Sequence, residues 1–259
     1  MESYTKIKIF LLILILIFLI FKLKDLLLDL LTPIEEFLKA AENGNLKKIK
    51  SMLNKEINIK TLINAVDKEN NTALILASKF GYSEIVKILI ENGADVNAKN
   101  NDDSTALIEA SSFYYETVKL LIENGADINA KDSGGTTPLM NATTEDDNYE
   151  ICKLLIENGA NVNDKDFQGD SPLIYASTFL TWDLAIIKLL IERGIEINVQ
   201  NKDGYTALME ATISNNAEIV KVLIENGADI NIKNNDGKTA LDYAEENDYK
   251  NIIELLKNN

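Results

Sequence analysis

A six-residue pattern occurs six times at nearly constant spacing, and this repetition constrains the fold more than any other feature of the sequence. The copies read TALILA, TALIEA, TPLMNA, SPLIYA, TALMEA and TALDYA, and they begin at Thr72, Thr105, Thr137, Ser171, Thr206 and Thr239. Successive copies start 33, 32, 34, 35 and 33 residues apart. A second shared block, such as IVKILIENGADVNAK, follows each of the first five copies. Such a period is typical of proteins that stack one small structural unit many times.

Each unit reads as two short helices joined by turns. Thr72 and its equivalents precede Ala or Pro, so their side-chain hydroxyls are expected to cap the first helix of each unit. In the second helix, Ile85, Val86 and Leu89 belong to one apolar face at helical spacing. A glycine such as Gly93 follows, where a left-handed residue ends the helix. A pair of helices this small cannot bury its own apolar face, so neighbouring pairs must supply the missing surface.

The pattern resembles the ankyrin repeat, whose unit has a Thr-Pro-Leu-His start, a second helix and a Gly-Ala-Asp-Val-Asn ending. The resemblance covers Thr32 to Asn259. It implies an all-α solenoid of stacked helix pairs with hairpin or turn connections. We expect a capping repeat at about 32–66 and repeats at about 67–99, 100–131, 132–165, 166–200, 201–233 and 234–259. Residues 1–31 form a separate hydrophobic region ahead of this domain.

The ankyrin pattern places histidine fourth in the hexapeptide, but this chain has no histidine. The fourth position is occupied by Ile75, Ile108, Met140, Ile174, Met209 and Asp242. The family's usual histidine hydrogen bonds between repeats must therefore be absent, and we expect apolar packing to substitute for them. The single cysteine, Cys152, occupies the position that Val86, Val118 and Val220 hold in other repeats. We therefore expect it to be a buried apolar group and not a nucleophile.

The N-terminal region predicts a membrane anchor. Between Ile9 and Phe21 the chain runs for thirteen residues without a polar side chain. A helix over Ile7–Leu23 is barely long enough to span a bilayer, which predicts a single-pass membrane protein. Lysines lie on both sides of the run, so its orientation stays open. A cleaved signal peptide is the alternative, although no small-residue cleavage site follows Phe21. A buried helix fits less well, because the run is apolar all round.

Composition narrows the class of function. The absence of histidine removes the commonest general base and the commonest zinc ligand, and we expect no catalytic site, metal or cofactor. A formal charge of −15 disfavours nucleic acid, since such binding depends on Lys and Arg at phosphates. The sequence therefore predicts a noncatalytic, membrane-tethered scaffold that binds another protein through a monomeric repeat domain. The alternatives are an exported effector and an enzyme with an acidic site assembled across repeats.

The resemblance also implies where a partner binds, namely the concave surface made by the hairpin tips and the first helices. Large amphipathic side chains are common anchors at binding surfaces. The aromatic candidates at the matching positions are Phe80, Phe113, Phe167, Phe179 and Tyr205. The polar candidates are Lys79, Asn101, Asp102, Gln168 and Asp203. For each ring, the alternative is that it merely covers its own repeat.

Overall fold

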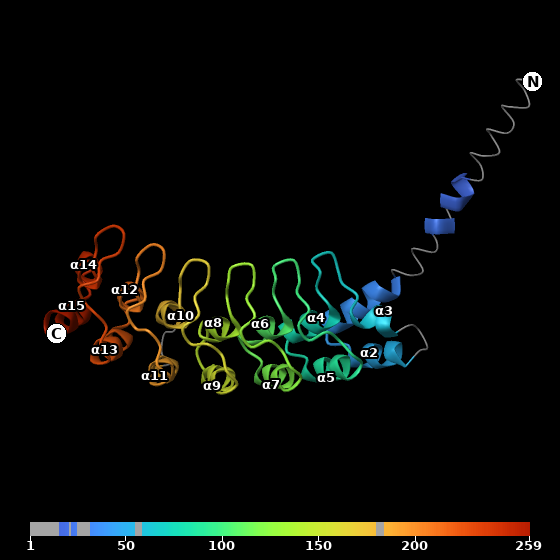
Figure 1. The fold of residues 1–259 in the computed structure, drawn as a ribbon, viewed down its shortest axis with the longest axis horizontal. Coiled ribbons are helices and arrows are strands. Elements are labelled where there is room, and N and C mark those ends of the chain that lie inside the picture. The colour runs from blue at the N-terminus through green and yellow to red at the C-terminus, as the bar shows by residue number, and fades with distance from the viewer. Residues whose placement is uncertain (1–15, 21, 25–31, 55–58, 180–183) are drawn as a thin grey trace, which may run out of the picture.

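Two layers of short helices run through the repeats, and hairpins project from the inner layer (Figure 1). The computed structural model describes residues 16–20, 22–24, 32–54, 59–179 and 184–259. The inner helices are α4 (Ala73–Lys79), α6 (Ala106–Ala110), α8 (Pro138–Ala142), α10 (Pro172–Phe179), α12 (Ala207–Ile213) and α14 (Ala240–Glu246). The outer helices are α5 (Ser83–Glu91), α7 (Tyr115–Glu123), α9 (Tyr149–Glu157), α11 (Leu184–Glu192), α13 (Ala217–Glu225) and α15 (Lys250–Lys257). The predicted all-α solenoid is confirmed for the repeat domain.

The stack begins with a helix at residues 32–42 and α2 (Leu46–Leu53), which are followed by the short α3 (Ile59–Ile63). Phe37 and Ala41 of the first helix are fully buried, so this helix is part of the domain core. Residues 16–20 and 22–24 are helical and exposed, but the rest of the predicted anchor Ile7–Leu23 lies outside the described residues. Within the part of the chain that the structure describes, no helix is both long and apolar enough to cross a bilayer.

Local sequence determines where the helices begin and end. Oγ1 of Thr72 accepts a hydrogen bond from the backbone N–H of Ile75 at 3.2 Å, which caps α4 as predicted. The equivalent bond is made by Thr105, Thr137, Ser171, Thr206 and Thr239. Gly93 follows α5 with a φ of +87°, the left-handed conformation expected there. Both ends of the helix pair are therefore set by residues of the shared blocks.

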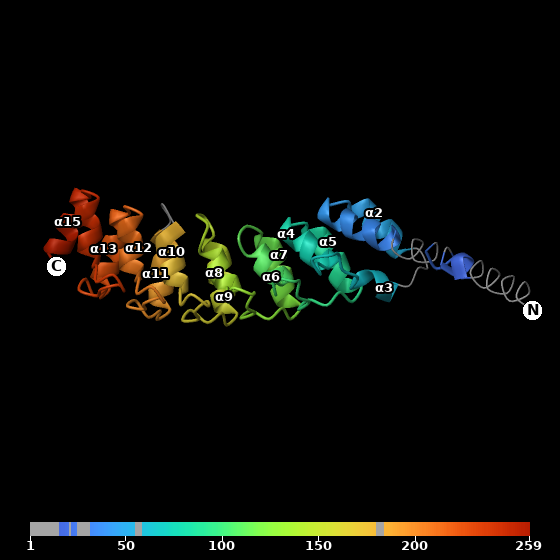
Figure 2. The ribbon, with the colours of Figure 1, turned by 90° about the horizontal axis from the view of Figure 1, so that it is seen from above.

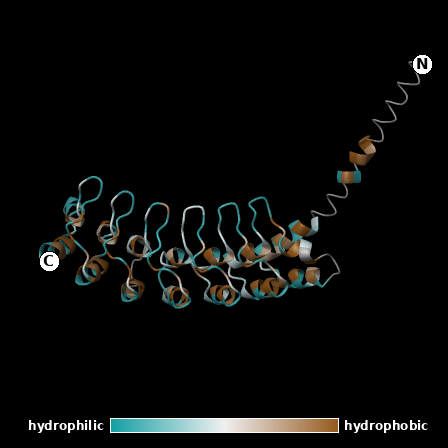
Figure 3. Cartoon of the chain, in the orientation of Figure 1, coloured by the Kyte–Doolittle hydropathy of each residue, from teal (hydrophilic) through white to brown (hydrophobic). Residues whose placement is uncertain are grey.

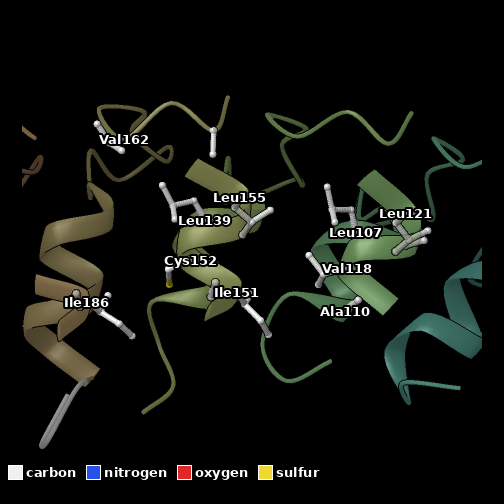
Figure 4. Close-up of a cluster of buried hydrophobic side chains, with 14 of the residues drawn as sticks. Leu107, Ala110, Val118, Leu121, Leu139, Ile151, Cys152, Leu155, Val162 and Ile186 are labelled. Atoms are coloured by element: carbon white, nitrogen blue, oxygen red, sulfur yellow. The ribbon is translucent and has the colours of Figure 1, made fainter. Parts of the chain in front are cut away.

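The helices pack against their partner in the same repeat and against the next helix of the same layer. Thus α4 contacts α5 and α6, and α5 contacts α7, an order that continues to α14 and α15. Buried apolar side chains form one cluster along this stack, part of which Figure 4 shows around Leu107, Leu139 and Cys152. These three residues are at most 1 % exposed. Cys152 is therefore the buried group that the sequence predicted.

Apolar side chains fill the histidine position in the first five repeats, as predicted. Residues at most 3 % exposed occupy it, namely Ile75, Ile108, Met140, Ile174 and Met209. In the last repeat, the Asp242 carboxylate instead accepts hydrogen bonds from the backbone N–H and the hydroxyl of Thr239, at 2.7 and 2.8 Å. The backbone bond first, and then the hydroxyl bond, lower the pKa of Asp242, because both favour its ionised form.

Asparagine side chains join each repeat to the next along the turns that follow the outer helices. Oδ1 of Asn97 accepts a hydrogen bond from the backbone N–H of Asp127 at 2.7 Å, and its Nδ2 donates to the carbonyl of Gly125 at 3.0 Å. The same two bonds are made by Asn64, Asn129, Asn163 and Asn198. We call these five residues the asparagine ladder. The expectation that apolar packing alone substitutes for the histidine bonds is therefore incomplete, because polar bonds also link the repeats.

The hairpins are closed by side chains and linked to one another by the backbone. Oδ1 of Asp166 accepts hydrogen bonds from the N–H groups of Gln168 and Asp170, both at 2.8 Å, which closes one hairpin tip. The N–H of Phe167 donates to the carbonyl of Gly134 in the preceding hairpin at 2.8 Å. Figure 3 shows that the hairpins are mostly polar, whereas the helices carry apolar residues. The hairpins thus form a linked polar row beside the inner helices.

Candidate partner-binding surface

The structure divides the predicted contact residues between two edges of the repeat domain. The hairpin tips carry Asn101, Asp102, Phe167, Gln168 and Asp203. The turns between inner and outer helices carry Phe80 and Phe113, and Lys79 is the last residue of α4. Figure 2 shows the hairpins and these turns at opposite ends of the helices. The side chain of Phe179 lies outside the described residues. The predicted residues therefore do not form one patch.

Two of the hairpin candidates also hold the hairpins together. Asn101 accepts a hydrogen bond from Nδ2 of Asn70 at 2.6 Å and donates one to the carbonyl of Lys68 at 3.2 Å. The ring of Phe167 lies on Gly135 of the preceding hairpin, where an added Cβ would come within 2.8 Å of it. Phe167 is nevertheless 58 % exposed. It covers the neighbouring repeat and still offers surface to a partner.

Tyr205, in the hairpin before α12, forms a hydrogen-bonded pair with Tyr243 of α14. Its hydroxyl lies 2.8 Å from the hydroxyl of Tyr243, and Nδ2 of Asn234 donates a hydrogen bond to the same Tyr243 oxygen at 2.8 Å. Burial, followed by the hydrogen bond to Tyr205, raises the pKa of Tyr243 to about 12. Tyr205 therefore helps to join the final two repeats, whatever else it contacts.

Aromatic residues gather at the turn between α4 and α5 and at the turn between α6 and α7. We call Phe80, Tyr82, Phe113, Tyr114 and Tyr115 the aromatic rim. Phe80 is 42 % exposed, Phe113 is 61 % exposed and Tyr115 is 38 % exposed. Because α4 and α6 are in contact, the two phenylalanines stand at the ends of adjacent helices. Both phenylalanines are thus exposed at neighbouring turns, and their contact with a partner stays a prediction.

Two tyrosines fix the aromatic rim to the repeats beneath it. The ring of Tyr114 lies so close to Gly81 that an added Cβ there would be 2.1 Å away, and Tyr82 covers Gly44 at 2.7 Å. The rings of Phe113 and Tyr114 have centroids 6.0 Å apart and meet edge to face. Each exposed phenylalanine is therefore next to a tyrosine that is held in place. Side chains ordered before binding lose less entropy when a partner arrives.

A polar pocket lies where the inner helices α10 and α12 meet the hairpins that precede them. We call this side of the inner helices, beside the hairpins, the inner face. The volume of the pocket is about 230 Å³, and it is lined by Asp170, Ile174, Tyr175, Thr178, Asn201 and Glu210. Oδ1 of Asp170 accepts a hydrogen bond from Nδ2 of Asn201 at 2.8 Å. Burial raises the pKa of the two carboxyl groups in the lining, those of Asp170 and Glu210. The charge of Asp170 raises the pKa of Glu210 further. We call this site the acidic pocket.

The surroundings of the acidic pocket are acidic as well. The hydroxyl of Tyr175 donates a hydrogen bond to Oδ2 of Asp166 at 3.0 Å, and burial is the main cause that raises the pKa of Tyr175 to about 12. The charges of Asp166 and Asp203 add to the rise in the pKa of Asp170. Across the described residues, no group of three or more His, Cys, Asp or Glu side chains is placed to hold a metal ion. The pocket therefore presents carboxylate charge that is partly shielded from water.

Sequence reasoning did not select Tyr175 or Glu210. Both occupy the fifth position of the hexapeptide, which reads Leu76, Glu109, Asn141, Tyr175, Glu210 and Tyr243 from the first repeat to the last. The other five positions stay within a narrow set of residues in nearly every copy, because packing or capping constrains them. The variability of this one position was the signal that could have identified the inner-face residues.

Comparison with known proteins agrees with this architecture. The family model described as ankyrin repeats (3 copies) matches residues 37–132, 130–201 and 173–259. The crystal structure of the human ASB11 ankyrin repeat domain is similar to this chain with a TM-score of 0.69 and 27 % identity, over 80 % of this chain and 90 % of that chain.

Curated relatives match shorter stretches. The Notch-regulated ankyrin repeat-containing protein of Xenopus laevis is 37 % identical over 71 residues, which are 27 % of this chain and 62 % of that protein. The acyl-CoA-binding domain-containing protein 6 homolog of Dictyostelium discoideum is 58 % identical over 43 residues, or 16 % of this chain and 15 % of that protein. The chain therefore spans less than two thirds of the length of these relatives. The family model, by contrast, matches from residue 37 to residue 259, and the chain belongs to the ankyrin-repeat family.

Proposed function

We propose that this chain is a noncatalytic scaffold that binds a partner protein along the inner face of its repeats and the adjoining aromatic rim. The observation that carries the proposal is the exposure of Phe80 and Phe113, 42 % and 61 %, in the turns that follow the adjacent helices α4 and α6. Neither ring belongs to the buried apolar cluster of the stack. Exposed aromatic rings that are held in place are the usual anchors of protein interfaces.

Affinity capture with the full chain tests this proposal. Proteins retained from a lysate would be identified, purified and titrated against the chain. Replacing both Phe80→Ala and Phe113→Ala should weaken the direct affinity at least about tenfold, because two anchors are lost. The helical circular dichroism should stay unchanged, since both residues lie outside the buried cluster.

The matched control replaces two exposed side chains of the outer helices, Lys119→Ala and Lys188→Ala. This pair should leave the affinity within about twofold, because changes at surface positions away from an interface are close to neutral. A partner that binds the Phe80→Ala and Phe113→Ala variant as tightly as the unaltered chain would refute the role of the aromatic rim. Retention of no protein at all would refute the scaffold function.

We also propose that the N-terminal region Ile7–Leu23 tethers the scaffold to a membrane. The support is the uninterrupted apolar run in the sequence, together with exposed large side chains at its described end, where Phe18 is 65 % exposed and Leu23 is 59 % exposed. Apolar surface of this extent is costly in water. Sodium carbonate extraction of cell membranes should leave the chain in the pellet, and N-terminal sequencing should find Met1 to Phe21 intact. Release into the supernatant would reject the tether, and a missing segment would favour a signal peptide.

A further inference from the structure

The inner face has a second hollow at its N-terminal end. This apolar cavity of about 630 Å³ lies between the helix at residues 32–42, the first hairpin and α4. Its apolar lining consists of Ile34, Leu38, Val66 and Leu76. Val66 is 44 % exposed, so its side chain is accessible from the cavity. We call this site the apolar cavity.

The apolar cavity and the acidic pocket lie on the same face of the domain. Leu76 lines the first, Glu210 lines the second, and both occupy the fifth position of the hexapeptide. The first hollow lies between the helix at residues 32–42 and α4 and the second between α10 and α12, so four helix spacings separate them. At about 8–10 Å per spacing, the two hollows are roughly 32–40 Å apart. A single segment of about 21–27 helical residues spans that distance.

Charge distinguishes the two hollows. The acidic pocket contains two carboxylates and no basic residue among its lining side chains, and further carboxylates, Asp166 and Asp203, act on Asp170. The apolar cavity carries charges of both signs around its four apolar side chains, namely the acidic Glu35, Glu42, Asp67 and Glu69 and the basic Lys39 and Lys68. A ligand that lies across both hollows is therefore attracted by its cationic groups to the C-terminal hollow and by its apolar groups to the N-terminal one.

We propose that the inner face binds one amphipathic segment of the partner protein, with large apolar side chains in the apolar cavity and a Lys or Arg side chain in the acidic pocket. The inference rests on the proposed scaffold function and specifies the chemistry and orientation of its partner. A guanidinium or ammonium group offsets the repulsion between Asp170 and Glu210 and replaces water with charge-assisted hydrogen bonds. The net charge of −15 favours a basic partner over an acidic one.

Peptide selection tests the proposal while the partner protein is still unidentified. A phage library of about 30-residue peptides would be selected on the full chain, immobilised through its C-terminus. Enriched peptides should share a cluster of large apolar residues and one or two basic residues at a constant separation. One enriched peptide would then be labelled and titrated by fluorescence anisotropy.

Variants on both sides of the contact locate the two ends of the peptide. The Asp170→Asn and Glu210→Gln double variant should weaken binding about tenfold or more and reduce its salt dependence. Replacing the basic residues of the peptide with Gln should cause the same loss, with little further loss on the double variant, because the two changes remove one interaction. Val66→Asp should weaken binding about tenfold through the apolar end.

Glu123→Gln with Glu225→Gln, two outer-helix positions, is the charge-matched control and should change affinity less than twofold. Enriched peptides without basic residues, or a double variant that binds like the unaltered chain, would overturn the inference while leaving the scaffold function intact. If a partner protein binds but competes with no enriched peptide, the inference also fails. If the chain retains neither peptide nor protein, the scaffold function fails with it.

Discussion

The N-terminal and C-terminal halves of the inner face share a framework and differ in chemistry. At the fifth hexapeptide position, Leu76 lines the apolar cavity, whereas Glu210 lines the acidic pocket four repeats later. At the position just before, both halves bury an apolar side chain, Ile75 in one and Met209 in the other, each 1 % exposed. The fourth position is apolar and buried in both halves, whereas the fifth changes from a leucine that is 8 % exposed to a half-buried glutamate. Adjacent residues of the same helix therefore pack the stack and set the chemistry of the inner face.

The largest expected effect comes from breaking the framework between the two halves. Leu139 is 1 % exposed in the third repeat, between the two hollows. Leu139→Ala should lower the free energy of unfolding by about 2–5 kcal/mol, because it leaves a cavity in the stack. The unfolding transition should also broaden, since each repeat is stabilised by its neighbours. Urea unfolding monitored by circular dichroism measures both effects, and an unshifted midpoint would contradict the stacked core.

The asparagine ladder should contribute equally to the stability of both halves. Asn97→Ala and Asn163→Ala each remove two hydrogen bonds to the following repeat. Each should cost about 1–2 kcal/mol in the free energy of unfolding. Asn92→Ala, whose side chain bonds within its own helix to the carbonyl of Ile88, is the control and should cost less. A large difference between Asn97→Ala and Asn163→Ala would show that the two halves do not share one framework.

A smaller effect is expected where the aromatic rim meets the backbone. Gly81 has a φ of +69° and lies under Tyr114, whereas Gly93 has a φ of +87° and nothing within 4 Å of an added Cβ. Both substitutions to Ala strain the backbone, by about 1 kcal/mol. Only Gly81→Ala should also displace the Tyr114 ring and weaken partner binding. Thermal unfolding and tyrosine fluorescence of the two variants separate strain from displacement, and identical behaviour would argue against the packing of Tyr114 on Gly81.

The smallest expected effect concerns charge at the fifth position. Burial raises the pKa of Glu210, so its protonated form favours folding below the unfolded pKa of about 4.3, and this stability is lost as pH rises through the folded pKa. Glu210→Gln should therefore stabilise the domain near neutral pH by less than about 1 kcal/mol, with no gain in acid.

Glu109→Gln provides the N-terminal counterpart. Oε2 of Glu109 lies 3.9 Å from Nζ of Lys79, so removing its charge loses a weak ion pair and should not stabilise the domain. Melting temperatures recorded from acid to neutral pH compare Glu210→Gln with Glu109→Gln. An equal gain in melting temperature from both variants would show that the charge of Glu210 does not specifically destabilise the acidic pocket.

The fold was predictable because its signals are local and repeated. Thr72 precedes a helix and caps it, and Gly93 ends one in a left-handed conformation, both as the sequence indicated. The asparagine ladder was not predicted, although Asn97 belongs to a block present in five repeats. Its role depends on which backbone groups of the next repeat lie opposite, and that is a property of the stack.

The binding surface was predictable only in part, for the same reason. Phe80, Phe113 and Phe167 were selected because they match the family's partner-binding positions, and all three are exposed. The acidic pocket joins Asp170 to Glu210, forty residues apart in sequence, and exists only once neighbouring repeats are in register. The sequence of one repeat cannot assign a residue to a site when the other residues of that site come from a different repeat.

The hairpin bonds and the asparagine ladder join each repeat to the next in the same way. A repeat can therefore be added without changing how its neighbours are joined. Duplicating residues 132–165 would insert one more unit with the same joints on both sides. The two hollows would then move apart by one helix spacing, about 8–10 Å, with their linings unchanged. The number of repeats between the hollows therefore sets their separation, and the proposed partner segment has to carry its apolar and basic side chains at that same separation.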